Sequence, residues 1–128
     1  MVTEEMIKQI CKDYSSSRRN IFLAEKSLNM YNRKVAEAKT DSEKNIYRYA
    51  IDRREREIEE SNHKIEVFER IAHQLPEDEL WVMEQIYGKN KKWGEVPDKE
   101  GGIIPKSKVT TIWKRAIRHM KYYLCEDT

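Results

Sequence analysis

The chain has 128 residues, of which 25 are Lys or Arg and 23 are Asp or Glu, so its formal net charge is only +2. This length accommodates one domain or two small ones and excludes a large enzyme core. A charge density this high would favour disorder if the charges had one sign, but the two signs nearly cancel. Four Gly and three Pro supply few turns, so we expect an all-α protein.

The sequence contains no run of roughly 18 apolar residues that would suit a membrane span. Its first ten residues, MVTEEMIKQI, lack the order of a signal peptide, so we expect a cytoplasmic protein that does not bind membranes. Cys11 and Cys125 have no Cys or His neighbour at metal-ligand spacing. We therefore expect buried or idle thiols, with no disulfide, no metal and no cofactor.

Apolar residues recur every seven positions in the N-terminal part, residues 1–74, in the manner of a coiled-coil seam. One heptad position holds Ile7, Tyr14, Ile21, Leu28 and Val35. Three serines at 15–17 interrupt the pattern and predict a helix break, with Ser17 capping a helix that begins at Arg18.

A second long helix is predicted from the capping box Thr40-Asp41-Ser42-Glu43 to about Gln74. Two long helices joined by a short loop predict an antiparallel hairpin. Each helix buries only one face, so the remaining apolar residues favour a homodimer formed through this arm. A monomeric helical bundle is the alternative.

The C-terminal part, residues 75–128, begins with helix signals. Pro76 and the acidic residues 77–79 predict a helix start, and Gly88 before the lysine-rich residues 89–92 predicts its end. Ser107 is expected to cap a last helix. Its inward face is predicted to be Val109, Ile112, Trp113, Ala116, Ile117, Met120 and Leu124.

The outward face of this last helix is strongly basic. Six Lys or Arg and no Asp or Glu lie between Ile103 and Leu124, and residues 88–123 hold ten basic against three acidic residues. Basic side chains attract phosphates, and short polar side chains near a helix N-terminus approach base edges in the major groove. The alternative interpretation is a solvated face that merely balances acidic residues elsewhere.

The segment from Leu75 resembles region 4 of bacterial sigma factors and the helix-turn-helix of related phage regulators. Three blocks carry the resemblance: Leu75-Pro76-Glu77 with Val82-Met83 and Tyr87-Gly88, then Trp93-Gly94-Glu95-Val96, then Ser107-Lys108-Val109 with Arg115-Ala116. The resemblance implies a scaffold helix beginning at the second block and a recognition helix beginning at the third. It also implies that Lys106, Lys108, Thr110, Thr111 and Lys114 face DNA.

Pro97 departs from the family pattern, because it follows directly where the scaffold helix would continue. Nothing in residues 1–74 resembles the sigma regions that bind core polymerase, so the whole chain is more similar to late-gene regulators of temperate phages, the ArpU and RinA type. The full set of expected DNA-binding residues is Lys106, Ser107, Lys108, Thr110, Thr111, Lys114, Arg115, Arg118, Lys89, Lys91 and Lys92.

The resulting hypothesis is a sequence-specific DNA-binding regulator of transcription, acting as a homodimer. One alternative is the small terminase subunit of a phage packaging machine, and the other is an adaptor that binds RNA polymerase without reading DNA. The histidines and carboxylates form no acid-base or metal constellation, so we do not expect an enzyme. Trp93 and Trp113 are expected in the core, while Trp81 is left open.

Overall fold

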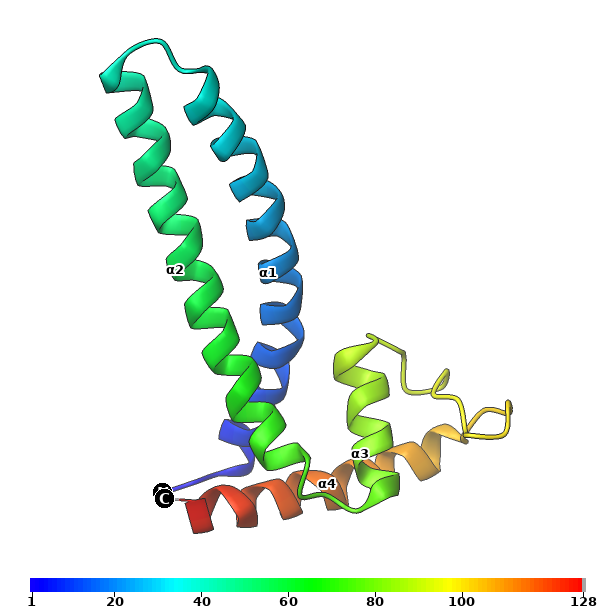
Figure 1. The fold of residues 1–128 in the computed structure, drawn as a ribbon. Helices are drawn as coiled ribbons and strands as arrows, with labels where there is room; N and C mark the ends of the chain where they lie inside the picture. Colours follow the sequence, from blue (N-terminus) through cyan, green and yellow to red (C-terminus); the bar gives the residue numbers. More distant parts are fainter. Residues whose placement is uncertain (128) are drawn as a thin grey trace.

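The computed structural model describes residues 1–127, and Thr128, the last residue of the predicted C-terminal part, lies outside them. The chain forms α1 (Glu4–Glu37), α2 (Asp41–Ala72), α3 (Glu77–Met83), a π-helical turn η1 (Glu84–Gly88) and α4 (Lys106–Asp127). The predicted all-α class with a long N-terminal hairpin is confirmed. Figure 1 shows an L-shaped molecule, in which α4 crosses the base of the α1/α2 hairpin and α3 stands beside it. No helix of the described residues is long and apolar enough to cross a bilayer.

Helix α1 is continuous, so the break predicted at residues 15–17 is wrong. The Ser16 hydroxyl donates to the Lys12 carbonyl at 2.7 Å, so the backbone of the same helix satisfies this polar group. Ser17 is buried, and so is Ser61 on α2. Two small buried side chains, one on each helix, let the hairpin close tightly where longer residues would hold the helices apart.

Helix α2 begins where the capping box predicts. The Thr40 side chain accepts a hydrogen bond from the Glu43 amide at 3.2 Å. The Glu43 carboxylate accepts from the Lys39 amide at 3.3 Å, one residue before the position that the motif assigns to it. The helix ends at Ala72, two residues before the predicted end at Gln74.

The main hydrophobic core lies at the base of the hairpin. At its centre the rings of Tyr14 and Phe68 stack with centroids 4.0 Å apart. The core joins residues from all four α-helices: Ile7, Cys11 and Tyr14 from α1, Phe68, Ile71 and Ala72 from α2, Met83 from α3, and Ala116, Ile117 and Met120 from α4, with Leu75 beside them. Residues on both sides of the predicted boundary at 74/75 therefore share one core.

The predicted inward face of α4 is confirmed, because all seven of its residues are buried or half-buried. Towards the helix N-terminus, Val109 and Ile112 pack in a second core cluster with Val82, Ile86 and Val96. Ser107 is not the N-cap, since α4 begins at Lys106. The Pro105 carbonyl instead accepts from the amides of residues 108 and 109, each at 3.0 Å.

The packing of α4 over the hairpin base predicts different reactivities for the two cysteines. Cys11 is buried in the main core, and this burial raises the pKa of its thiol to about 12. At pH 8 only about one Cys11 in 10,000 is then a thiolate, the form that reacts. Cys125 is exposed on α4. A disulfide reagent should modify one thiol per native chain and two after denaturation. Cys125→Ser should leave none reactive in the native state, and fast modification of Cys11 would contradict this packing.

Candidate nucleic-acid interface

The outward face of α4 presents the predicted DNA-facing side chains to solvent. Of the eight predicted residues on this helix, Thr110 alone is half-buried, and the others are exposed. Ser107, Thr111, Lys114 and Arg118 are spaced four, three and four residues apart, so they form one stripe along the helix. We call these four residues the α4 stripe.

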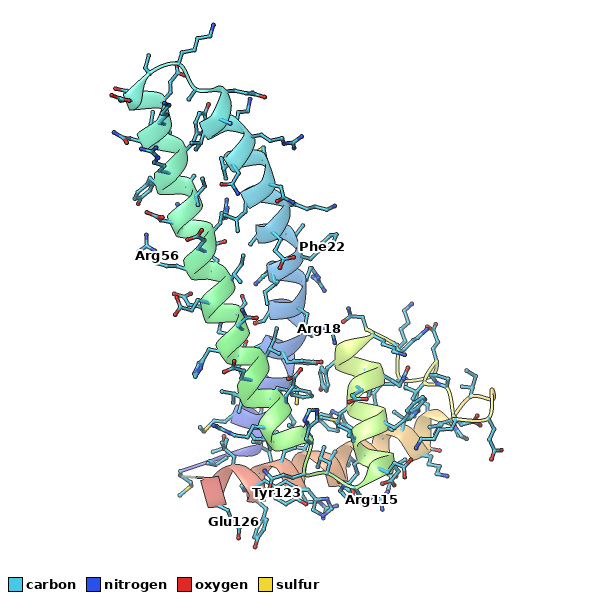
Figure 2. All side chains as sticks on the ribbon, in the orientation of Figure 1. Arg18, Phe22, Arg56, Arg115, Tyr123 and Glu126 are labelled. Carbon is cyan, nitrogen blue, oxygen red and sulfur yellow. The ribbon has the colours of Figure 1, made fainter. Side chains whose placement is uncertain are left out.

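Two cations of this stripe are unpaired. Lys114 and Arg118 form no ion pair with any described residue, whereas Arg115 Nη2 lies 3.1 Å from Asp78 Oδ2 on α3. Figure 2 shows the labelled Arg115 beneath α4, on the flank of the helix where it meets Asp78 of α3. Further along the same flank, His119 Nδ1 lies 2.5 Å from Glu79 Oε1, whose side chain is only 3% exposed. Arg115 is therefore partly neutralised and helps to hold α3 against α4.

The two lysines at the start of α4 lie in different surroundings. Lys108 lines a hollow with three acidic residues and one further lysine: Glu77, Asp78, Asp98 and Lys99. Lys106 lines another hollow with Lys92, Trp93 and Glu95. The two side chains therefore project to opposite flanks of the helix, and the flank that holds Lys106 has fewer acidic groups.

The threonine hydroxyls are already engaged as donors. Thr110 Oγ1 donates to the Lys106 carbonyl at 3.0 Å, and Thr111 Oγ1 donates to the Ser107 carbonyl at 3.1 Å. Each hydroxyl oxygen still has lone pairs and can accept a hydrogen bond. Thr111, which is exposed, can therefore accept from a base amino group and present its methyl group to a thymine.

The scaffold helix predicted at Trp93-Gly94-Glu95-Val96 is absent, because residues 89–105 form a loop. Pro97 disfavours helical backbone at Val96, and Gly94 adds little helix propensity. The chain forms an isolated antiparallel bridge between Pro97 and Ile103 instead, and the Val96 carbonyl accepts from the Ile104 amide at 2.9 Å. Of the two helices of a helix-turn-helix, only the one corresponding to the recognition helix, α4, is found where the resemblance implies it.

This loop is fixed by specific contacts. Trp81 Nε1 donates to the Pro97 carbonyl at 2.7 Å, which gives a role to the tryptophan left open by the sequence. Asp98 Oδ1 accepts from the amides of Glu100 and Gly102 at 2.9 and 2.8 Å. Gly101 has φ = 95°, a value that favours glycine. The loop therefore has a defined shape beside the N-terminus of α4.

The other two tryptophans have the structural role that was expected. The ring centroids of Trp93 and Trp113 lie 5.0 Å apart. Trp113 Nε1 donates to the Tyr87 hydroxyl at 3.0 Å, and burial raises the pKa of Tyr87. Both tryptophans are half-buried and pack on the second core cluster, so they stabilise the fold.

The predicted lysines 89, 91 and 92 are exposed, but the segment that carries them is attached to α1. Asn90 Oδ1 accepts a hydrogen bond from Ser15 Oγ at 2.8 Å. A Cβ on Gly88 would lie 3.3 Å from Arg18 Nη1. Sequence reasoning missed this involvement of α1, because Ser15 and Asn90 are 75 positions apart and no local pattern connects them.

No protein-family model, curated protein or solved structure matches this chain. Within residues 1–127, no group of three His, Cys, Asp or Glu side chains is placed to hold a metal ion.

The contacts of Asp98 predict that its side chain holds the loop in shape. Asp98→Ala removes the acceptor for two amides, so it should lower the free energy of unfolding by about 1 kcal/mol. Hydrogen exchange at the Gly102 amide should become faster. Glu100→Ala, in the same turn but without a side-chain contact among the described residues, is the control. Unchanged protection of Gly102 in Asp98→Ala would show that the other contacts of the loop, such as the bridge between Pro97 and Ile103, hold its shape.

Proposed function

We propose that this chain binds double-stranded DNA through the outward face of α4 and regulates transcription. The observation that carries the DNA-binding proposal is the α4 stripe, in which Lys114 and Arg118 are exposed without an acidic partner among the described residues. The regulatory role rests on the resemblance of residues 75–116 to sigma region 4. Sequence-specific recognition is part of this proposal and is assigned to Thr111 and its neighbours on the stripe.

The charge distribution around α4 favours one direction of approach. The 22 residues of this helix extend over about 33 Å, and a major groove about 12 Å wide admits a helix. Glu77 and Asp78 of α3 are paired with Lys99 and Arg115, so the flank of α4 that faces α3 offers fewer unpaired cations to phosphates. A duplex therefore approaches from the side of Lys106 and Lys114 and meets the α4 stripe.

The missing scaffold helix changes how such a duplex would be held. In a helix-turn-helix the first helix crosses the DNA backbone and helps to set the register of the second. Here the loop takes its place, so phosphate contacts made by α4 itself supply a larger share of the affinity. Binding should consequently depend strongly on salt, since each neutralised phosphate releases counterions.

Replacing the two unpaired cations tests the proposed face. Lys114→Ala with Arg118→Ala should weaken binding to a duplex about tenfold and lower the salt slope of log affinity by about 2. Fluorescence anisotropy at several salt concentrations measures both quantities. The matched control is Arg48→Ala with Arg56→Ala, which removes two exposed cations from α2.

Equal losses in both double variants would mean that net charge alone determines binding, and no loss would remove α4 from the interface.

Thr111→Ala should change sequence preference, measured by sequencing selected duplexes, more than it changes bulk affinity. A chain that ignores DNA but captures RNA polymerase would favour the adaptor alternative.

We also propose that the chain forms a homodimer through the hairpin. Ile46 and Tyr49 are 67% and 66% exposed, and they lie three residues apart on α2, where they are surface neighbours. Burying such side chains against a second copy removes apolar area from water.

Light scattering at micromolar concentration should give twice the monomer mass, and Ile46→Ser with Tyr49→Ser should give the monomer mass. A monomeric wild-type chain would contradict the dimer. A ring of many subunits would also contradict it and would favour the terminase alternative. Because both residues are exposed, the substitutions should leave the helical circular dichroism unchanged.

A further inference from the structure

A second basic surface lies in the inner angle of the L-shaped molecule, between α1 and the lysine-rich loop that follows η1. We call it the inner corner and define it by five cations and one aromatic residue: Arg18, Phe22, Lys26 and Arg33 on α1, and Lys89 and Lys91 in the loop. All six are exposed. Figure 2 shows the labelled Arg18 and Phe22 on the side of α1 that faces the C-terminal part of the molecule.

The residues from α1 form a stripe that leads directly to the loop. Arg18, Phe22 and Lys26 are spaced by four residues, and Arg33 follows seven residues later, so all four lie on one helix face. Ser15, one turn before Arg18 on the same face, bonds to Asn90 between the two lysines. Gly88 lies against Arg18. These contacts hold the loop lysines beside the N-terminal end of the stripe, next to Arg18.

The cations of the inner corner have no acidic partners among the described residues. Arg18 Nη1 donates to the Tyr14 hydroxyl at 2.9 Å, and Lys26 Nζ lies 4.5 Å from the centroid of the Phe22 ring. From residue 12 to residue 34, α1 holds six basic and only two acidic residues. The surface therefore favours a polyanion.

This surface is separate from the α4 stripe. Residues of η1 contact the inward face of α4, as the hydrogen bond from Trp113 to Tyr87 shows, and the loop lysines follow directly after η1. The loop therefore lies on the inward side of α4, whereas the stripe lies on its outward side. A straight duplex lying along the α4 stripe cannot also lie in the inner corner.

We infer that the inner corner binds the phosphate backbone of a second segment of double-stranded DNA. From Arg18 to Arg33 the helix rises about 22 Å, which is about two thirds of one turn of a duplex. Platforms for single strands stack successive bases on several aromatic rings, but Phe22 is the one exposed aromatic side chain of this surface. Evenly spaced cations along a straight helix fit a stiff duplex better. One chain would then hold two duplex segments, one on each side of its C-terminal part.

Counting duplexes per chain tests this inference when the duplex is in excess, so that two protomers do not share one duplex. Sedimentation at low salt with a duplex of about 15 base pairs should give two duplexes per wild-type chain. Lys26→Ala, Arg33→Ala and Lys91→Ala together should give one. The matched control, Arg48→Ala, Arg56→Ala and Lys64→Ala on α2, should still give two. All six positions are exposed, so circular dichroism should report intact helices.

The α4 variant Lys114→Ala with Arg118→Ala separates this inference from the proposed function. At a duplex concentration that fills the wild-type α4 site but not the weakened one, this variant should bind one duplex, and adding the three corner substitutions should abolish that binding. If the corner variant still binds two duplexes, or if the wild type binds only one, the inner corner is not a DNA site. If a single strand displaces the corner-bound duplex at equal concentration, the inferred ligand is wrong. If the α4 variant retains two duplexes and the corner variant loses one, the proposed role of α4 fails and the inner corner stands.

Discussion

Helix α4 has two sets of neighbours and buries one face against both. Its first half packs on Val82, Ile86 and Val96, and its middle packs on the base of the hairpin around Tyr14 and Phe68. This shared burial determines which side of α4 remains in contact with water. Basic side chains avoid burial without partners, so the lysines and arginines of α4 occupy the remaining side. The position of the hairpin thereby decides which residues are available to a nucleic acid.

The loop between η1 and α4 shows how a segment without regular structure acquires a defined shape. Two polar side chains fix it. The indole N–H of Trp81 donates to the Pro97 carbonyl, and the Asp98 carboxylate accepts from two amides of the following turn. A sigma-like protein would have a helix here, which would contribute backbone amides and side chains to a DNA phosphate. Replacing that helix by a loop removes one means of setting register. In the proposed complex, the electrostatic part of binding would remain, because it requires only positive charge on the outward side of α4.

Features encoded locally were predictable from the sequence. The capping box at Thr40, the acidic start of α3 and the apolar spacing of α4 each involve residues within a few turns of one another, and the structure agrees with all three. The predicted break at residues 15–17 was wrong because packing between α1 and α2 outweighs the weak helix preference of serine. The predicted scaffold helix was wrong because one proline overrode a motif resemblance. The inner corner was not predictable, since it brings together residues of α1 and of the loop that are 56 to 73 positions apart and depends on how α1 meets η1.

Burial is distributed unevenly along the hairpin. Between residues 25 and 60, all of which the structure describes, no side chain is fully buried, whereas the base holds Ile7, Cys11, Phe68 and Ile71 at 1% exposure or less. Segments with few buried contacts open locally at low free energy, while those in the core open only when the whole protein unfolds. The far end of the hairpin should therefore exchange its amide protons much sooner than the base. Arg18 lies near the slowly exchanging end of α1 and Arg33 near the faster exchanging end, so the two ends of the inner corner should differ in the free energy of local opening.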